Sequence, residues 1–178
     1  MITILLILAN LLAYVAELAF GGQSVCEAYG LVPAHAHFDA IFTSMFLHDP
    51  AIMAHLGGNM VFLAVFGTIV EREIGRLRFL VLYLAAGVGG ALLHILVNPV
   101  ATEALVGASG AIYGVMAVVA VLRPRLLGLV GAFAVLNIWY ALTGTGGSVS
   151  FGDHLGGFAV GALFVASMRL REKMEAVT

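Results

Sequence analysis

Long apolar stretches alternate with short polar segments along this chain. The apolar stretches cover six ranges: 2–20, 54–70, 79–97, 109–122, 126–143 and 154–168. A helix needs about 20 apolar residues to cross the roughly 30 Å hydrocarbon core of a bilayer. The pattern therefore predicts an all-α membrane protein with six transmembrane helices.

The composition supports this class. Hydrophobic residues make up 62% of the 178 residues and charged residues only 10%, whereas roughly a quarter of the residues in soluble globular proteins are charged. So little sequence lies outside the apolar stretches that we expect a single domain, residues 1–178. The first stretch has no basic segment before it and exceeds the about 7–15 apolar residues of a secretion signal, so we expect it to be retained as a span.

The basic residues all lie in alternate loops. They follow spans two, four and six: Arg72, Arg76, Arg78, Arg123, Arg125, Arg169, Arg171 and Lys173. The loops after spans one and three instead carry acidic residues: Glu27, Asp39, Asp49 and Glu103. Because loops rich in Lys and Arg stay in the cytoplasm, we expect both termini there. The net charge of −2, with no basic cluster in an outer loop, gives no reason to expect nucleic-acid binding.

The connection between the first two spans, residues 21–53, is far longer than the usual few residues between helices. It is rich in Phe, Met, Leu and His. Irregular backbone exposed to lipid would leave polar groups unpaired, so we expect short helices lying at the membrane interface. Cys26 is the single cysteine, so it has no internal disulfide partner, and we expect a small loop residue.

Strongly polar residues inside membrane spans are costly and usually mark a function. Span two carries His55 and Asn59, whose spacing of four residues places them on one helix face. Span four begins with Ser109 and span six with His154. All three spans run from outside to inside, so these residues come to one depth near the outer surface. The sequence predicts one polar cavity where the three spans touch.

Small residues allow spans four and six to approach closely. They are Gly110, Gly114 and Ala117 in span four, and Gly157 and Gly161 in span six. Gly157 and Gly161 lie three and seven residues beyond His154 and therefore share its face. We expect the close-packed face of span six to be the face that presents the histidine.

Span four has only about 14 residues, or roughly 21 Å of helix, which is too short to cross the whole core. We therefore expect Ser109 below the outer surface, beside unpaired backbone N–H groups and the positive end of the helix dipole. A serine nucleophile needs a base, which His154 would supply. His55 and Asn59 would join the N–H groups in an oxyanion hole.

Several motifs occur together in one order. They are 43–48 (TSMFLH), 55–59 (HLGGN), 71–75 (EREIG), 107–110 (GASG) and 152–157 (GDHLGG). On these motifs the chain resembles the rhomboid intramembrane serine proteases over essentially its whole length. Residues 107–110 match the family's GxSG nucleophile motif, 152–157 resemble its base motif, and 55–59 its HxxxN oxyanion element. The resemblance implies a rhomboid-like bundle of six transmembrane helices with a long first outer loop.

The resemblance also implies a Ser–His dyad that cleaves transmembrane segments of membrane-protein substrates near the outer face. Ser109 would attack the peptide carbonyl, and His154 would act as base and then as acid. Tyr113 matches the tyrosine that stacks under this histidine in the family. The glycines expected to support the site are Gly107, Gly110 and Gly157. No cofactor and no metal is implied.

Two places need a separate interpretation. Asp153 precedes the histidine, but adjacent helical residues point about 100° apart and the family works without a carboxylate. We expect Asp153 to solvate the outer end of span six. The family often carries Trp-Arg in the first outer loop, where this chain has Phe38-Asp39-Ala40, so the resemblance does not extend to that loop's usual anchor.

The remaining histidines lack acidic or cysteine partners at metal-binding spacing, and we expect structural roles for them. They are His35, His37, His48 and His94. The segment 144–152 is rich in Gly, Ser and Thr and is expected to act as a lid. A substrate helix would then enter past span five and unwind locally.

Two other functions are open to such a chain. A catalytically inactive rhomboid-like protein would bind or chaperone membrane helices without cutting them. A separate alternative for His55 and Asn59 is an interhelical hydrogen bond that only stabilises packing. A transporter is disfavoured because midplane polar residues and an internal repeat are both lacking. The compact six-span form is similar to prokaryotic members, which favours a prokaryotic inner membrane. The particular substrate and the oligomeric state stay open.

Overall fold

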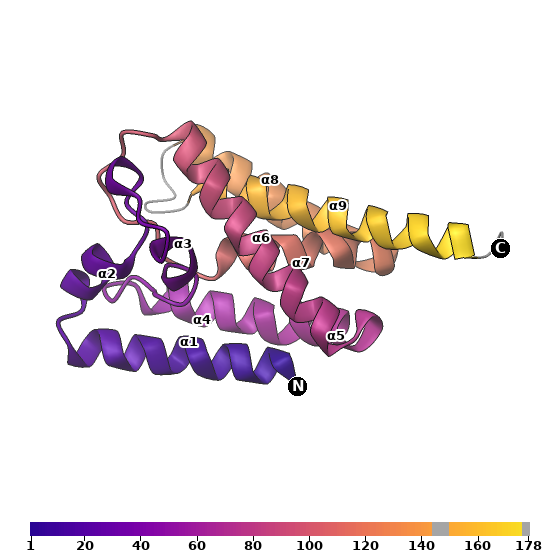
Figure 1. Ribbon diagram of the computed structural model, residues 1–178, viewed down its shortest axis with the longest axis horizontal. Coiled ribbons are helices and arrows are strands. Elements are labelled where there is room, and N and C mark those ends of the chain that lie inside the picture. Colours follow the sequence, from indigo (N-terminus) through magenta and orange to yellow (C-terminus); the bar gives the residue numbers. More distant parts are fainter. Residues whose placement is uncertain (144–149, 176–178) are drawn as a thin grey trace.

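The computed structural model describes residues 1–143 and 150–175. The helices of its bundle, shown in Figure 1, are α1 (Ile2–Ala19), α4 (Met53–Phe62), α5 (Thr68–Ile74), α6 (Arg76–Val97), α7 (Ser109–Leu122), α8 (Leu127–Thr143) and α9 (Phe151–Glu175). A five-residue π-helical stretch, η2 (Leu63–Gly67), joins α4 to α5. The short elements are α2 (Gln23–Tyr29), η1 (Pro33–His35), α3 (Ala40–Thr43) and η3 (Pro124–Leu126).

The prediction of an all-α membrane protein is confirmed for the described residues, where the only β pairing is an isolated bridge between Leu31 and Leu105. Four helical segments are long and apolar enough to cross a membrane: Ile2–Ala19, Met53–Ile74, Arg76–Val97 and Phe151–Arg171. The helices that begin at Ser109 and Pro124 are shorter. The structure therefore supports four spans, and a crossing by α7 and α8 stays a prediction.

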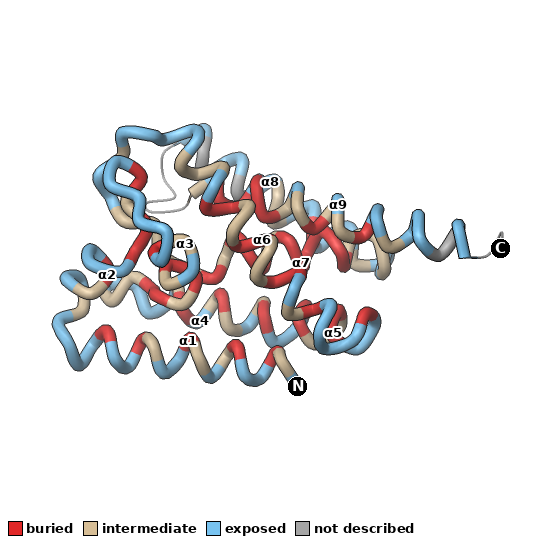
Figure 2. The backbone as a smooth tube through the Cα atoms, in the orientation of Figure 1, coloured by how far each residue is buried: buried red, intermediate tan, exposed pale blue. Residues whose placement is uncertain are grey.

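Helix α7 forms the centre of the molecule, and Figure 2 shows it buried along most of its length. It packs against both α6 and α9, which also pack against each other. Its side chains Val115, Val118 and Val119 are fully buried and belong to the largest cluster of apolar residues. Burial on all sides explains why the sequence of this helix is apolar all round.

Glycines let the backbones of α7 and α9 touch. A Cβ atom added to Gly157 would collide with the carbonyl oxygen of Gly110, and one added to Gly161 would collide with that of Gly114. The predicted close approach of spans four and six is thus confirmed. The same contacts fix the depth of His154 relative to the start of α7.

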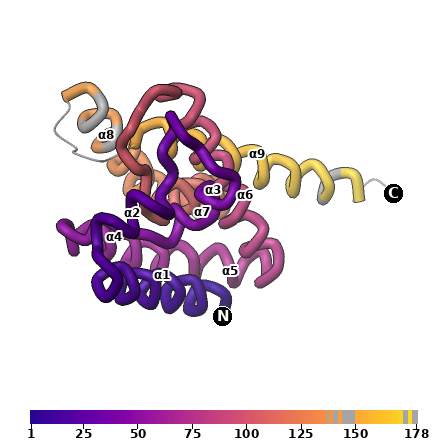
Figure 3. The backbone as a smooth tube through the Cα atoms, turned by 60° about the vertical axis from the view of Figure 1, so that its left-hand side comes forward, coloured from indigo at the N-terminus to yellow at the C-terminus, as the bar shows by residue number. Residues whose placement is uncertain are grey.

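The first outer loop folds into α2, η1 and α3, as expected from its apolar residues. Figure 3 shows α2 and α3 gathered near the end of the bundle where α7 begins. The loop is joined to the segment before α7 by the bridge to Leu105 and by the Gly107 N–H, which donates to the Ser44 carbonyl at 2.9 Å. Met45 packs directly on Gly87 of α6. The loop therefore helps to position the residues just before Ser109.

At the other end of the molecule, Glu71 of α5 forms hydrogen bonds with the start of α1. Its carboxylate accepts hydrogen bonds from the Ile2 N–H at 2.8 Å and from the Thr3 N–H and hydroxyl at 2.8 and 2.7 Å. These are donors that the first turn of a helix leaves unpaired. Gly75, with φ of +85°, then makes the tight turn from α5 into α6.

Candidate active site

Ser109 is the first residue of α7, and the backbone before it is shaped by glycine. Gly107 has φ of +128°, a conformation that L side chains rarely adopt. Space gives a second reason for glycine here, because an added Cβ would lie 2.8 Å from His55 Nε2 and 3.6 Å from Asn59 Nδ2. The side-chain nitrogens of α4 therefore border the chain two residues before the serine.

His154, a residue of α9, packs against the face of α7 that carries Ser109 and Tyr113. Its ring is 7% exposed and stacks on Tyr113, with the ring centroids 4.2 Å apart and an interplanar angle of 12°. Tyr113 lies four residues after Ser109, one turn along the helix. The stack thus places the imidazole against a residue that lies one helical turn after the serine.

The expectation that Asp153 solvates the outer end of α9 is wrong. Asp153 is only 4% exposed, and its carboxyl group fills the space left by two glycines, Gly90 of α6 and Gly110 of α7. The Ser109 hydroxyl donates to Asp153 Oδ2 at 3.4 Å, and the Gly110 N–H also donates to this carboxylate. Helix α7 has no capping side chain of its own, so Asp153 caps it from α9.

The side chains of His55 and Asn59 lie together, as their spacing predicts. Asn59 is 8% exposed, and its Nδ2 donates to His48 Nε2 at 3.1 Å. His55 packs against the ring of His48, with the centroids 5.2 Å apart, and its Nε2 borders Gly107, two residues before Ser109. The structure therefore brings residues of α4, α7 and α9 together at one end of the bundle.

Sequence reasoning missed part of this site. His48 was expected to be merely structural, yet it is fully buried and contacts both polar residues of α4. Glu17 of α1 is fully buried too, and its carboxylate accepts the His48 N–H at 3.1 and 3.2 Å. A single carboxylate inside an apolar span was a signal that could have identified Glu17.

The other three histidines lie in α6 and in the first outer loop. His94 of α6 bonds through Nδ1 to the Ser150 hydroxyl at 2.6 Å, and His35 and His37 are exposed in the first outer loop. Among the described residues, no group of three or more His, Cys, Asp or Glu could hold a metal ion. Most of the predicted lid, residues 144–149, lies outside the described residues.

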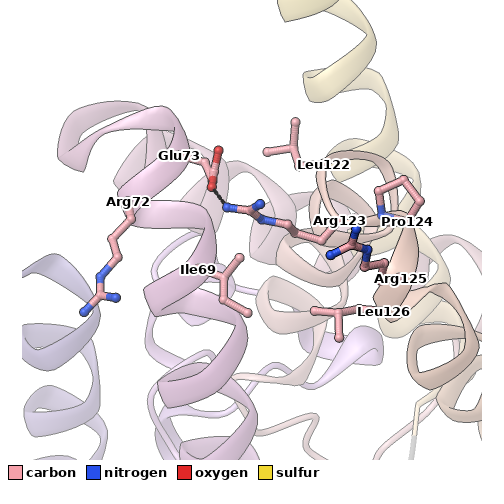
Figure 4. A pocket seen from close by; sticks show the side chains of 8 residues that line it. All are labelled: Ile69, Arg72, Glu73, Leu122, Arg123, Pro124, Arg125 and Leu126. Atoms are coloured by element: carbon pink, nitrogen blue, oxygen red, sulfur yellow. Dashed lines mark hydrogen bonds and ion pairs between the residues drawn. The ribbon is translucent and has the colours of Figure 1, made fainter.

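A cavity of about 660 Å³ lies at the far end of α7, where the helix meets η3 (Figure 4). Its lining comes from α5 and from the turn after α7: Ile69, Arg72, Glu73, Leu122, Arg123, Pro124, Arg125 and Leu126. An ion pair between Arg123 and Glu73 bridges the two sides. The cavity is separated from Ser109 by the length of α7, roughly 20 Å, so it is not the predicted site.

The relatives of this chain include proteins of a plant, a bacterium and a yeast. "Rhomboid-like protein 11, chloroplastic" of Arabidopsis thaliana is 36% identical over 113 residues, which cover 64% of this chain and 39% of that protein. "Rhomboid protease GluP" of Bacillus subtilis is 36% identical over 122 residues, covering 65% and 23%. "Rhomboid protein 1, mitochondrial" of Saccharomyces cerevisiae is 31% identical over 141 residues, covering 70% and 40%. The chain thus spans less than half the length of each.

These names include chloroplastic and mitochondrial proteins, so they do not support a prokaryotic inner membrane over other membranes. The helices that are long and apolar enough to cross a bilayer agree with a multi-pass membrane protein. Residues 35–171 match the Rhomboid domain, a stretch that contains the motifs around His55, Ser109 and His154. The chain therefore belongs to the rhomboid family.

Proposed function

We propose that this protein is an intramembrane serine endopeptidase that uses Ser109 and His154 as a catalytic dyad. The observation that carries the proposal is the stack of His154 on Tyr113, one turn after Ser109, with His55 and Asn59 nitrogens beside Gly107. A nucleophile, a base and oxyanion donors are the parts that acyl transfer needs. One relative, GluP, is named a rhomboid protease.

In the proposed reaction, His154 takes the hydroxyl proton of Ser109 while the oxygen attacks the carbonyl carbon of a peptide bond. The negative charge that develops on the carbonyl oxygen is stabilised by donors from His55, Asn59 and the Ser109 backbone. His154 then gives its proton to the leaving amine, and an acyl ester forms on Ser109. A water molecule, deprotonated by His154, hydrolyses that ester and frees the serine.

The site places one demand on this mechanism. The Ser109 hydroxyl donates to Asp153 in the structure, so the hydroxyl must turn from that carboxylate to His154 before it can attack. A rotation about the Cα–Cβ bond of serine is a fast step and costs little. We expect substrate binding to occur with this rotation.

The proposed substrates are transmembrane segments of other membrane proteins. A helical peptide bond keeps its carbonyl oxygen in a hydrogen bond and shields the carbon, so the segment must unwind at the site, which favours substrates with Gly or Pro near the outer face. Helix α8 is the proposed side of access because its described part packs sparsely on α7 and α9. The loop charges favour cleavage near the outer face, with both termini in the cytoplasm.

One observation favours the alternative, an inactive rhomboid-like protein that binds membrane helices. The Ser109 hydroxyl donates a hydrogen bond to the buried Asp153 carboxylate, so in this arrangement it does not donate to His154. If that contact is permanent, the serine is a capping residue of α7 and the same scaffold binds helices without cutting them. The two functions differ in whether Ser109 reacts.

A fluorophosphonate probe, which labels activated serines, tests the proposal without a known substrate. We expect the purified protein in detergent to be labelled at Ser109, as located by mass spectrometry, and labelling to disappear in Ser109→Ala and His154→Ala. Circular dichroism and the unfolding midpoint show whether each variant is folded. Absence of labelling in folded wild-type protein would reject the protease and support the helix-binding alternative.

A further inference from the structure

The buried histidine of the first outer loop carries an inference that rests on the proposed protease function. His48 has no exposed surface and lies between the loop and α4. Its Nε2 is 3.1 Å from Asn59 Nδ2, and its Nδ1 is 3.4 Å from the Phe46 carbonyl oxygen. Both ring nitrogens therefore have a partner.

The two partners select one tautomer of His48. An amide nitrogen only donates, so Nε2 must accept from Asn59; a carbonyl oxygen only accepts, so Nδ1 must carry the proton. This tautomer is neutral. Burial, with His55 as a smaller cause, lowers the pKa of His48 to about 4, so the acceptor at Nε2 is present throughout the neutral range.

The same tautomer selects the orientation of the Asn59 amide. With the amide turned by 180°, Asn59 Oδ1 would face the Nε2 lone pair, and both atoms would be acceptors. The other tautomer, with its proton on Nε2, would remove that repulsion. It would, however, place the unprotonated Nδ1 against the Phe46 carbonyl oxygen, and both of these atoms are acceptors. Both arrangements lose a buried hydrogen bond, which costs about 1–3 kcal/mol.

In the selected orientation, Asn59 can act as an N–H donor to the proposed oxyanion. One N–H of Nδ2 donates to His48. The nitrogen also borders Gly107, where an added Cβ would lie 3.6 Å from Nδ2, so its second N–H is available to an oxyanion on that side. A turned amide would instead present an oxygen to the developing oxyanion and repel it. His48 is itself held by the Glu17 carboxylate, which accepts its N–H, and by the Cys26 thiol at 3.5 Å from its carbonyl oxygen.

We propose that His48 is a positioning residue that fixes the Asn59 amide with its nitrogen toward the oxyanion site. It does not touch the reacting atoms; it acts through Asn59. The network runs from Glu17 in α1 through the first outer loop to α4. The loop thereby has a function in the proposed chemistry as well as in packing.

The test is a double-mutant cycle on the rate of Ser109 labelling by a fluorophosphonate probe in the full chain. We expect His48→Leu to lower the rate about tenfold to a hundredfold, below the 10²–10³ typical of deleting an oxyanion donor. In an Asn59→Ala background the same substitution should lower it less than about threefold, because the residue through which His48 acts is gone. His48→Gln, whose side-chain oxygen accepts from Asn59, should recover most of the rate.

The matched control is His37→Leu, the same substitution at an exposed histidine of the same loop, which should label like the wild type. A merely structural role for His48 predicts equal losses with and without Asn59 and no recovery by Gln. That outcome, or a wild-type rate in His48→Leu, would overturn the inference while Ser109 labelling of the wild type upholds the protease. An unlabelled wild type would reject the protease instead.

A second measurement covers the case in which His48→Leu does not fold. In wild-type protein with ¹⁵N-labelled histidine, assigned by comparison with His48→Gln, the NMR shifts should show His48 Nδ1 protonated and Nε2 unprotonated from pH 7 down to about 5. A proton on Nε2 in that range would overturn the inference.

Discussion

The two flanks of α7 are built differently. On one flank, α6 and α9 approach α7 so closely that no side chain would fit at Gly110 or Gly114. On the other flank, α8 makes few contacts with α7 in its described part. Its Phe133 pairs edge-on with Phe62 of α4 instead, with ring centroids 4.3 Å apart. Glycines of α8 such as Gly131 face open space.

The difference separates two requirements of the proposed enzyme. Catalysis needs Ser109 and His154 held to a fraction of an ångström, and backbone-to-backbone packing of α7 on α9 supplies that precision because it leaves no gap to close. Access of a substrate helix needs a neighbour that is displaced at low cost. The sparse packing of α8 fits that second requirement.

The largest effect is expected from adding one methyl group to each flank. Gly157→Ala places a Cβ against the Gly110 carbonyl, and such overpacking costs about 1–3 kcal/mol of the free energy of unfolding. Gly131→Ala is the matched change on α8, where the Cβ meets nothing and alanine stabilises a helix by about 0.5–1 kcal/mol relative to glycine. Unfolding titrations in detergent measure both. Effects of the same sign would contradict the comparison.

Substitutions of Asp153 test the flank of α7 that packs on α6 and α9, at the outer end of that flank. Asp153→Ala removes the acceptor for the Gly110 N–H and the Ser109 hydroxyl, and loss of a helix cap costs about 0.5–2 kcal/mol. Asp153→Asn keeps an acceptor oxygen and should lose less than half as much. The same unfolding titration measures both variants. An alanine variant as stable as the wild type would show that Asp153 does not cap α7.

Sequence reasoning predicted the position of α7 and the stack of Tyr113 on His154, because both follow from short sequence motifs. The start and end of α7 coincide with the predicted range 109–122, since a GxSG turn begins it and Arg123-Pro124 ends it. The stacking of Tyr113 on His154 followed from the resemblance. The roles of these residues in catalysis stay predictions.

What sequence reasoning missed are contacts between distant segments. Glu17 and His48 are 31 positions apart, and no periodicity links them. Asp153 was expected to face solvent because it lies at the outer end of its own helix. Its carboxyl group is instead buried in a space that Gly90 of α6 and Gly110 of α7 leave open. Such spaces depend on three helices at once and appear only after the bundle is assembled.

A smaller effect is expected from Tyr113, the ring of α7 that stacks on the proposed base His154. Tyr113→Leu keeps apolar bulk but removes the stack on His154, and aromatic pairs are worth about 0.5–1.5 kcal/mol beyond their buried area. The fluorophosphonate labelling rate of Ser109 should fall by up to about tenfold, because a less constrained imidazole is aligned less often. A labelling rate equal to that of the wild type would show that the stack does not orient the base.

The smallest effect is expected where α7 touches α8. The Tyr113 hydroxyl donates to the Phe133 carbonyl at 3.4 Å, a long bond to an oxygen that α8 already uses within its own helix, so Tyr113→Phe should cost less than about 0.5 kcal/mol. Probe labelling should stay within twofold of the wild type, because the stack on His154 remains. If α8 is the side of access, cleavage of a transmembrane substrate should rise while labelling by the small probe does not. A fall in labelling as large as that of Tyr113→Leu would mean that the hydroxyl serves the dyad, and the proposed division between the two flanks of α7 would fail at this contact.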